Sequence, residues 1–130
     1  MPGYDERHAK SGLKAPLPKI ETFPSQFPKY TVTLETPEYN AVCPKTGLPD
    51  FGTLTVTYEP ARDVIELKSF KEYLTAYRNV GIFYENAANR ILSDVVKAAR
   101  PRWCRVVLST GPRGGIKSVI EAVHGKAPRG

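Results

Sequence analysis

Two side chains that can do chemistry, Cys43 and Asp50, stand seven residues apart around a short segment rich in proline and glycine. A thiol becomes a good nucleophile when its thiolate is stabilised, and Lys45 is close enough in sequence to help. A carboxyl group in the same loop can supply or remove a proton. The spacing therefore indicates a nucleophile and an acid or base in one segment. Taken alone, the spacing favours instead a buried cysteine and an aspartate that caps a turn.

The other cysteine and two of the glutamates have simpler interpretations. Cys104 alternates with Trp103 and Arg105 in an apolar strand pattern, which favours packing in the core. Glu66 precedes the first predicted helix, and Glu85 lies in the first turn of the second, where a carboxylate complements the helix dipole. Glu85 could instead accept paired hydrogen bonds from a guanine-like base. Spacing alone favours the dipole interpretation.

Basic residues raise the possibility of a phosphate site. The net charge is +6 and the pI is about 9.4, which favours anionic partners. The cations are spread along the chain without tandem runs, so a defined phosphate pocket is favoured over a nucleic-acid tail. Lys68 and Lys71 share a helical face with Arg78, which is also typical of a solvated surface. The turn at 112–115 carries Arg113 and is either an ordinary hairpin or an anion-binding turn.

Several chemistries find no support in the sequence. The two histidines, His8 and His124, are far apart, and no clustered Cys/His spacing exists, so we expect no metal site. The glycine patterns of dinucleotide-binding and P-loop folds are absent. No apolar run is long enough to span a membrane, and the N-terminus lacks the apolar stretch of a signal peptide. We therefore expect a cytoplasmic protein with two free thiols.

The elements that must position these residues follow from periodicity. Alternation predicts a strand at 30–35, ended by Pro37, and a second at 51–58, with a loop at 39–50 between them. Shorter patterns predict strands at 64–67, 103–109 and 115–123. Helical spacing predicts one helix over 67–77, stopped by Asn79 and Gly81, and another over 83–99, closed by Pro101. This order predicts an α+β domain, an antiparallel sheet with two consecutive helices on one face.

The predicted domain organisation is simple. Residues 1–28 are expected to form an extended N-terminal arm, because Pro16, Pro18, Pro24 and Pro28 forbid a long helix or a central strand. Plain disorder of this arm is the alternative. Residues 29–125 are expected to form one domain, and 126–130 a frayed tail. The predicted sheet has open edges that need pairing, so we expect a homo-oligomer.

Several stretches together resemble the QueF nitrile reductase family, in its short, single-module form. They are 42–47 with 49–51, 66–73, 77–79, 83–86 and 112–115, in the family's order and spacing. The loop around Cys43 and the helix that begins Glu66-Leu67-Lys68-Ser69 are the most specific. The resemblance implies the tunnelling fold, in which antiparallel sheets of several subunits form a barrel by oligomerisation with active sites between subunits.

The resemblance also implies roles. The reaction is the NADPH-dependent reduction of the nitrile of 7-cyano-7-deazaguanine to an aminomethyl group, a step toward queuosine in tRNA. Cys43 would form a thioimide with the nitrile carbon and Asp50 would protonate the nitrogen. Glu85 and Tyr84 would anchor the deazaguanine ring, in a pocket also lined by Ile65, Glu66 and Leu67. Lys68, Lys71 and Arg113 would bind the phosphates of NADPH.

One departure from the family and two rival functions complete the expectations. Family members often carry histidine where this chain has Tyr84, which does not titrate near neutrality, so a proton-shuttling role is not carried over to this position. A related amidinotransferase that acts on the nitrile in tRNA would keep Cys43 and Asp50 without using NADPH. A non-catalytic RNA-binding module would need aromatic residues interleaved with cations on its surface, and no such pattern is evident.

Overall fold

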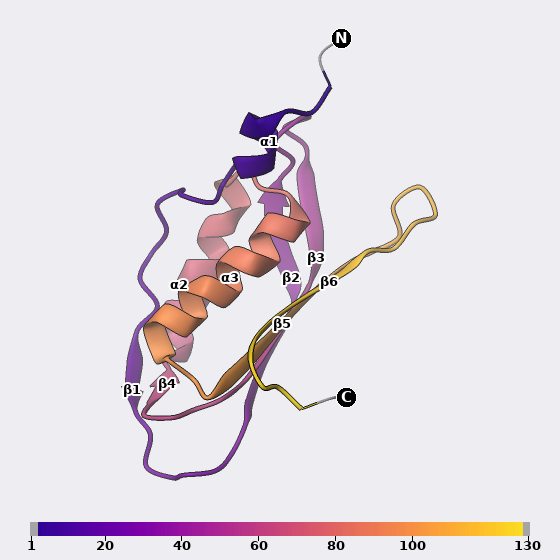
Figure 1. The fold of residues 1–130 in the computed structure, drawn as a ribbon. Coiled ribbons are helices and arrows are strands. Elements are labelled where there is room, and N and C mark those ends of the chain that lie inside the picture. The colour runs from indigo at the N-terminus through magenta and orange to yellow at the C-terminus, as the bar shows by residue number, and fades with distance from the viewer. Residues whose placement is uncertain (1–2, 129–130) are drawn as a thin grey trace.

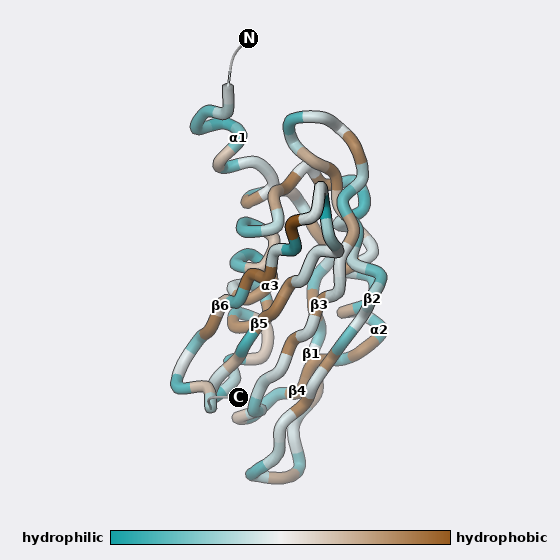
Figure 2. The backbone as a smooth tube through the Cα atoms, turned by 90° about the vertical axis from the view of Figure 1, so that its right-hand side faces the viewer, coloured by the Kyte–Doolittle hydropathy of each residue, from teal (hydrophilic) through white to brown (hydrophobic). Residues whose placement is uncertain are grey.

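A four-stranded antiparallel sheet forms one layer of the computed structural model, which describes residues 3–128 (Figure 1). The strands are β2 (Val32–Val42), β3 (Pro49–Glu59), β5 (Trp103–Thr110) and β6 (Val119–Gly125), in the order β2-β3-β5-β6. Along β3, Leu54, Val56 and Tyr58 are fully buried while the intervening threonines are only partly buried. Cys104 faces the core with Val106 and Leu108, as predicted. Apolar stretches recur along β3 and β5 in Figure 2.

Two helices cover one face of this sheet, as the periodicity predicted (Figure 1). Helix α2 (Leu67–Thr75) continues into the 3₁₀ turn η1 (Ala76–Asn79), and α3 (Tyr84–Ala99) follows. Ala87, Ala88, Ile91 and Val95 of α3 are fully buried, because they recur at the three- and four-residue spacing of one helical face. The antiparallel α+β architecture predicted from the sequence is therefore confirmed. No helix among the described residues is long and apolar enough to cross a membrane.

A buried polar network ties the two helices together. The hydroxyl of Tyr73 donates to Asp94 over 2.5 Å and shares a 2.8 Å hydrogen bond with the hydroxyl of Tyr77. Arg90 pairs with Asp94 at 3.2 Å and also donates to the carbonyl of Gly12 at 2.7 Å. The network thus joins α2, α3 and the N-terminal segment, and it satisfies polar groups that would be costly to bury alone.

The N-terminal segment lies against the domain. A short helix α1 (Glu6–Lys10) begins after Asp5, and β1 (Thr22–Pro24) pairs antiparallel with β4 (Asp63–Ile65) in a separate two-stranded sheet. Ile20 is 6% exposed and belongs to the core. Gly12 has a φ of 82°, and a Cβ there would stand 2.5 Å from the Cβ of Ile82, so only glycine fits this approach.

Three predicted boundaries were wrong. Pro37 does not end the first strand, because β2 runs to Val42 with a register shift between Thr36 and Tyr39. A proline is tolerated there because β2 is an edge strand and the irregularity takes the residue out of the ladder. The predicted loop at 39–50 accordingly shrinks to 43–48. Strand β6 begins at Val119 rather than 115, and β4 ends at Ile65, so Leu67 belongs to the helix. Residues 129–130 of the predicted tail lie outside the described part.

Candidate active site

The hairpin formed by β2 and β3 brings Cys43 and Asp50 onto one face. Asp50 pairs with Ala41 across the ladder, so their side chains point to the same side. Side chains alternate along a strand, and Cys43, two residues beyond Ala41, continues on that side. The backbone N–H of Cys43 donates to the carbonyl of Leu48, and the N–H of Gly47 to the carbonyl of Cys43, both at 2.9 Å. The loop is therefore a closed turn that holds the thiol at the sheet end.

The environment of Cys43 favours its thiolate. Partial burial raises the pKa of the thiol, but hydrogen bonds from the side chain and backbone of Thr46 and from the backbone of Lys45 lower it further, and the net shift of the pKa is downward. The nearby carboxylate of Asp50 opposes this shift. Lys45 contributes through its backbone, while its ammonium lies 5.3 Å from the ring centre of Tyr4. Burial raises the pKa of Cys104 to about 12, so the two thiols differ sharply.

Asp50 is a buried carboxylate with a cationic partner. Its side chain is 5% exposed and forms an ion pair with the guanidinium of Arg113, which comes from the turn between β5 and β6. The same guanidinium nitrogen lies 3.4 Å from the hydroxyl of Tyr84, and that hydroxyl donates to the carbonyl of Phe51 at 2.7 Å. Burial and the charge of Asp50 raise the pKa of Tyr84 above its ordinary value. Three distant segments thus converge beside the thiol.

The start of α3 is held beside the same loop. Val42 donates to the carbonyl of Val80 and accepts from the N–H of Ile82, both at 2.9 Å, so residues 80–82 run alongside the end of β2. Tyr84 and Glu85 follow directly in the first turn of α3. Glu85 is exposed there, on the end of the molecule that carries Cys43. The structure therefore brings together Cys43, Asp50, Tyr84, Glu85 and Arg113.

The remaining predicted site residues lie at the opposite end of the helices. Glu66 caps α2, accepting hydrogen bonds from the backbone N–H groups of Lys68 and Ser69 at 2.8 Å, and these bonds lower the pKa of its carboxyl group. Helix α3 separates this end from Glu85, and its 16 residues span about 24 Å. Ile65 is buried, whereas Leu67 is 64% exposed. Within one chain, Ile65, Glu66, Leu67, Lys68 and Lys71 therefore form a second group.

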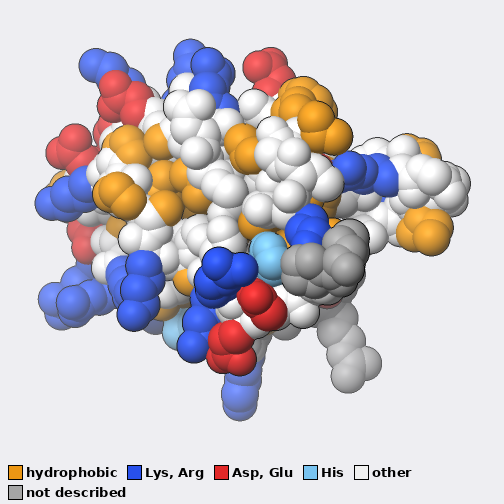
Figure 3. All heavy atoms as spheres, turned by 90° about the horizontal axis from the view of Figure 1, so that it is seen from above, with side chains coloured by type: hydrophobic (Ala, Val, Ile, Leu, Met, Phe, Trp, Pro, Cys, Tyr) orange, Lys and Arg blue, Asp and Glu red, His pale blue; other side chains and the backbone are white. Residues whose placement is uncertain are grey.

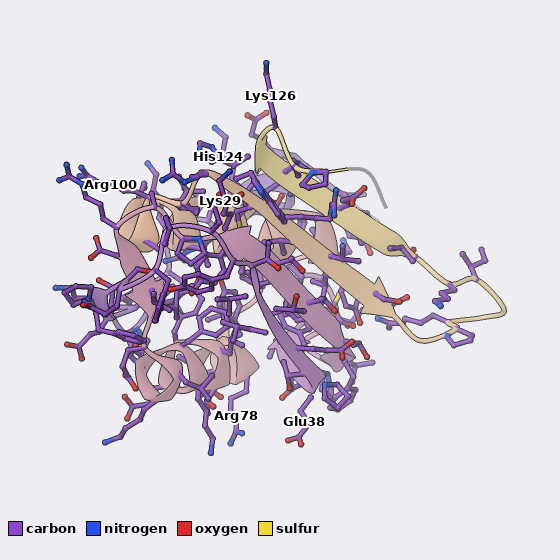
Figure 4. The ribbon with its side chains drawn as sticks, turned by 90° about the horizontal axis from the view of Figure 1, so that it is seen from below. Lys29, Glu38, Arg78, Arg100, His124 and Lys126 are labelled. Carbon is purple, nitrogen blue, oxygen red and sulfur yellow. The ribbon has the colours of Figure 1, made fainter. Side chains whose placement is uncertain are left out.

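Two features of β2 and its surroundings were not predicted from the sequence. A groove of about 520 Å³ runs between β2 and α2, and Lys71, Arg78, Glu35 and Glu38 contribute charged side chains to its walls. Arg78 and Glu38 lie on opposite sides of it in the view from below (Figure 4). Tyr39 is 3% exposed, and its hydroxyl has no hydrogen-bond partner among the described residues. Because residues 39–50 were predicted to form a loop, the strand alternation that buries Tyr39 was not recognised.

The distribution of charged side chains and of possible metal ligands describes the surroundings of the site. Viewed from above, Lys and Arg side chains are spread around the periphery and do not gather in one patch (Figure 3). No group of three or more His, Cys, Asp or Glu side chains stands ready to hold a metal ion in residues 3–128. What the site does combine is an activated thiol and a buried carboxylate. A thiol with a lowered pKa and a nearby carboxylate are the two groups that nucleophilic attack on an electrophilic carbon with proton transfer requires.

Comparisons with known proteins identify the family of the chain. Residues 49–129 match the sequence model of a family described as QueF-like protein, and the chain belongs to that family. It is 50% identical to the NADPH-dependent 7-cyano-7-deazaguanine reductase of Elusimicrobium minutum over 125 residues, 95% of each chain. The same reductase from Syntrophus aciditrophicus is 50% identical over 113 residues, 85% of this chain and 81% of the relative.

A solved structure supports the fold assignment. The archaeosine synthase QueF-Like in its apo form is similar with a TM-score of 0.69 and 28% sequence identity. The match covers 75% of this chain and 96% of that one. The predicted resemblance to the QueF family is therefore confirmed by the sequence comparisons, and the solved structure agrees in fold.

Proposed function

We propose that this chain reduces the nitrile of 7-cyano-7-deazaguanine to an aminomethyl group with NADPH, as the names of its reductase relatives describe. The observation that carries the proposal is the pairing of an activated thiol, Cys43, with the buried carboxylate Asp50 in a chain half identical to those reductases. A nitrile becomes an amine by gaining two hydrides and two protons. NADPH supplies one hydride at a time, so two molecules bind in turn.

The chain's own residues account for the covalent step. The thiolate of Cys43 attacks the nitrile carbon and forms a thioimide, while Asp50 delivers a proton to the nitrogen. Glu85, in the first turn of α3, accepts hydrogen bonds from the ring N–H and amino group of the base. Tyr84 stacks on the base or offers its hydroxyl, which already lies within reach of Arg113. Burial of Asp50 excludes water from the proton transfer.

We also propose that the active site forms between two copies of the chain. Glu85 and Cys43 lie at one end of the helices, and Ile65, Glu66 and Leu67 lie at the other. A neighbour can join the sheet edge to edge, because β2 and β6 are the edge strands of the four-stranded sheet, and we place its α2 end beside Cys43 of this copy. Repetition of this contact closes a barrel of the tunnelling type. Lys68 and Lys71 of the neighbour would then bind NADPH phosphates in the cytoplasm, where that dinucleotide is available.

One assay tests the proposed reaction. Purified protein is mixed with free 7-cyano-7-deazaguanine, and NADPH absorbance is followed together with product mass. The expected result is oxidation of two NADPH for each amine formed. If the protein oxidises no NADPH with the free base, the reductase assignment is wrong. The amidino-transferring activity on tRNA, favoured only by the archaeosine synthase likeness at 28% identity, would then be tested with nitrile-bearing tRNA.

Mixed assemblies test the shared site. Cys43→Ala removes one half of the proposed site, and Lys68→Ala with Lys71→Ala removes the other. At an NADPH concentration well below the KM of the lysine variant, Cys43→Ala should be inactive and the lysine variant should retain only a small fraction of the wild-type rate. Co-expressed in equal amounts, they should regain about a quarter of the sites, because each half is intact with even odds. No recovery in verified mixed oligomers would contradict a site between subunits.

A further inference from the structure

The turn between β5 and β6 places one cation on the proposed catalytic carboxylate. Arg113 lies in this turn, where its N–H and carbonyl both bond Ile116, at 2.7 and 3.1 Å. Its side chain is 55% exposed, yet its guanidinium reaches the carboxylate of Asp50, which is 5% exposed. The two residues are 63 positions apart in the sequence. Hydrogen bonds from the guanidinium to Asp50 and Tyr84 raise the pKa of Arg113 above its ordinary value.

This contact constrains the position of the Asp50 carboxylate. A charged hydrogen bond to a guanidinium orients a carboxylate, and a buried carboxylate without its cationic partner is costly to the fold. The groups that face Asp50 are the thiol of Cys43, the hydroxyls of Tyr39 and Tyr84, and Arg113. Arg113 is the cation in direct contact with the carboxylate. Arg113 therefore sets the position and orientation of the carboxylate that faces the thiol.

We propose that Arg113 is a positioning residue for the covalent step, holding the carboxylate of Asp50 oriented so that it relays the thiol proton to the nitrile. This rests on the proposed reductase function. The S–H bond of Cys43 breaks and its proton passes to Asp50. A bond forms from sulfur to the nitrile carbon as one C≡N π bond opens, and Asp50 gives the proton to nitrogen. Asp50 ends ionised, as it began, and no external electrons are needed.

The proposal assigns Arg113 differently from a phosphate contact for NADPH. Its guanidinium already has two partners, Asp50 and Tyr84, on the end of the chain that carries Cys43. Lys68 and Lys71 belong to the other end. Loss of Arg113 should therefore slow adduct formation before any cofactor binds. A phosphate contact would leave the adduct step unchanged and weaken NADPH use.

The test compares Arg113→Gln and Arg113→Lys with the wild type. The measurement is the rate of the Cys43 adduct with 7-cyano-7-deazaguanine, followed by mass spectrometry across pH without NADPH. Arg113→Gln should form the adduct at least about tenfold more slowly at neutral pH. Arg113→Lys should restore part of the rate. Lys117→Gln, an exposed cation in the same turn, is the matched control and should behave as the wild type.

Two outcomes would overturn the proposal. One is an Arg113→Gln variant with wild-type adduct rate and pH profile. The other is a raised KM for NADPH as its only defect. If Arg113→Gln unfolds, the double variant Asp50→Asn with Arg113→Gln removes both charges and should fold, while Arg113→Lys still reports the rate. A wild type that forms no adduct at all would instead contradict the reductase function itself.

Discussion

The two ends of the helix layer hold the proposed site residues in different ways. At the end of the β2–β3 hairpin, Cys43 and Asp50 come from one hairpin and Arg113 from a distant turn, and the guanidinium of Arg113 contacts Asp50. At the start of α2, the carboxylate of Glu66 bonds the first turn of its own helix, and Lys68 and Lys71 are exposed. The first end is an assembled site within one chain. The second presents its side chains outward, as a surface that another copy can complete.

This difference between the two ends shows which site residues can be recognised from contacts within one chain. A buried carboxylate with an ion pair is a costly arrangement that needs several segments to persist, so it marks a site directly. An exposed pair of lysines on a helix has no comparable energetic cost, so its contacts do not identify a site. The proposed roles at the α2 end therefore depend on assembly, whereas those at the hairpin end are testable in their own geometry.

The largest expected effect is at the thiol. Cys43→Ala should abolish turnover with the fold intact, and Cys104→Ala should retain turnover with some loss of stability, because Cys104 is fully buried. Thiol alkylation followed by mass spectrometry should modify Cys43 at a pH below that of an ordinary cysteine, since its pKa is lowered. Cys104, with its pKa near 12, should stay unmodified in folded protein. A nitrile adduct on Cys104 would contradict the assignment.

The next effect concerns recognition at the hairpin end. Glu85→Ala leaves the donors of the base unpaired and should weaken nitrile binding by about 2–3 kcal/mol. Isothermal calorimetry on the Cys43→Ala background isolates binding from chemistry. Glu85→Gln keeps the shape and should recover only part of the loss. Binding unchanged within twofold would remove Glu85 from the pocket.

At the α2 end the expected effect is on cofactor choice. Replacing Lys68 and Lys71 with alanine should raise the KM for NADPH and reduce its preference over NADH, at a cost of about 1–2 kcal/mol in kcat/KM. Adduct formation at Cys43 should stay within twofold of the wild type. Steady-state kinetics with both dinucleotides measure the change, and Lys97→Ala provides a control at an exposed helix position. An unchanged dinucleotide preference would make these lysines ordinary surface residues.

The smallest expected effect separates structure from binding at Glu66. Glu66→Ala removes the N-cap of α2 and should lower Tm by a few degrees. The folded pKa of Glu66 lies below its ordinary value of 4.5, so the cap contributes fully above that pH and is lost as pH falls through the folded pKa. The Tm difference between wild type and variant should therefore shrink in acid. A Tm difference independent of pH would contradict the capping role.

Sequence patterns predicted the elements better than their junctions. Helix α3 was placed within one residue because Ala87, Ala88, Ile91 and Val95 repeat at helical spacing. The proline rule failed at Pro37 because tolerance of proline depends on which strand lies at the sheet edge, and this is a property of the assembled sheet. Because the part of β2 after Pro37 was not predicted, the burial of Tyr39 was not predicted either.

The candidate site was predicted in part. Cys43 and Asp50 share one hairpin, so their spacing in the sequence was informative. The contact of Arg113 with Asp50 joins residues 63 positions apart, and no local pattern pairs them. The pKa of Cys43 is lowered by hydrogen bonds from the side chain and backbone of Thr46 and from the backbone of Lys45, whose directions depend on the turn geometry. Ion pairs between residues far apart in the sequence are therefore not predicted from a single sequence.

The tyrosines between the helices also set an alkaline limit for the fold. Burial raises the pKa of Tyr73 and Tyr77 above the ordinary value of 10.0, and Tyr39 behaves alike. A raised folded pKa means that their contribution to the free energy of unfolding is complete below pH 10 and declines as pH rises above it. In strong base the unfolded chain can release phenolic protons that the folded chain must keep. We therefore expect alkaline unfolding to begin in the packing that joins α2 to α3.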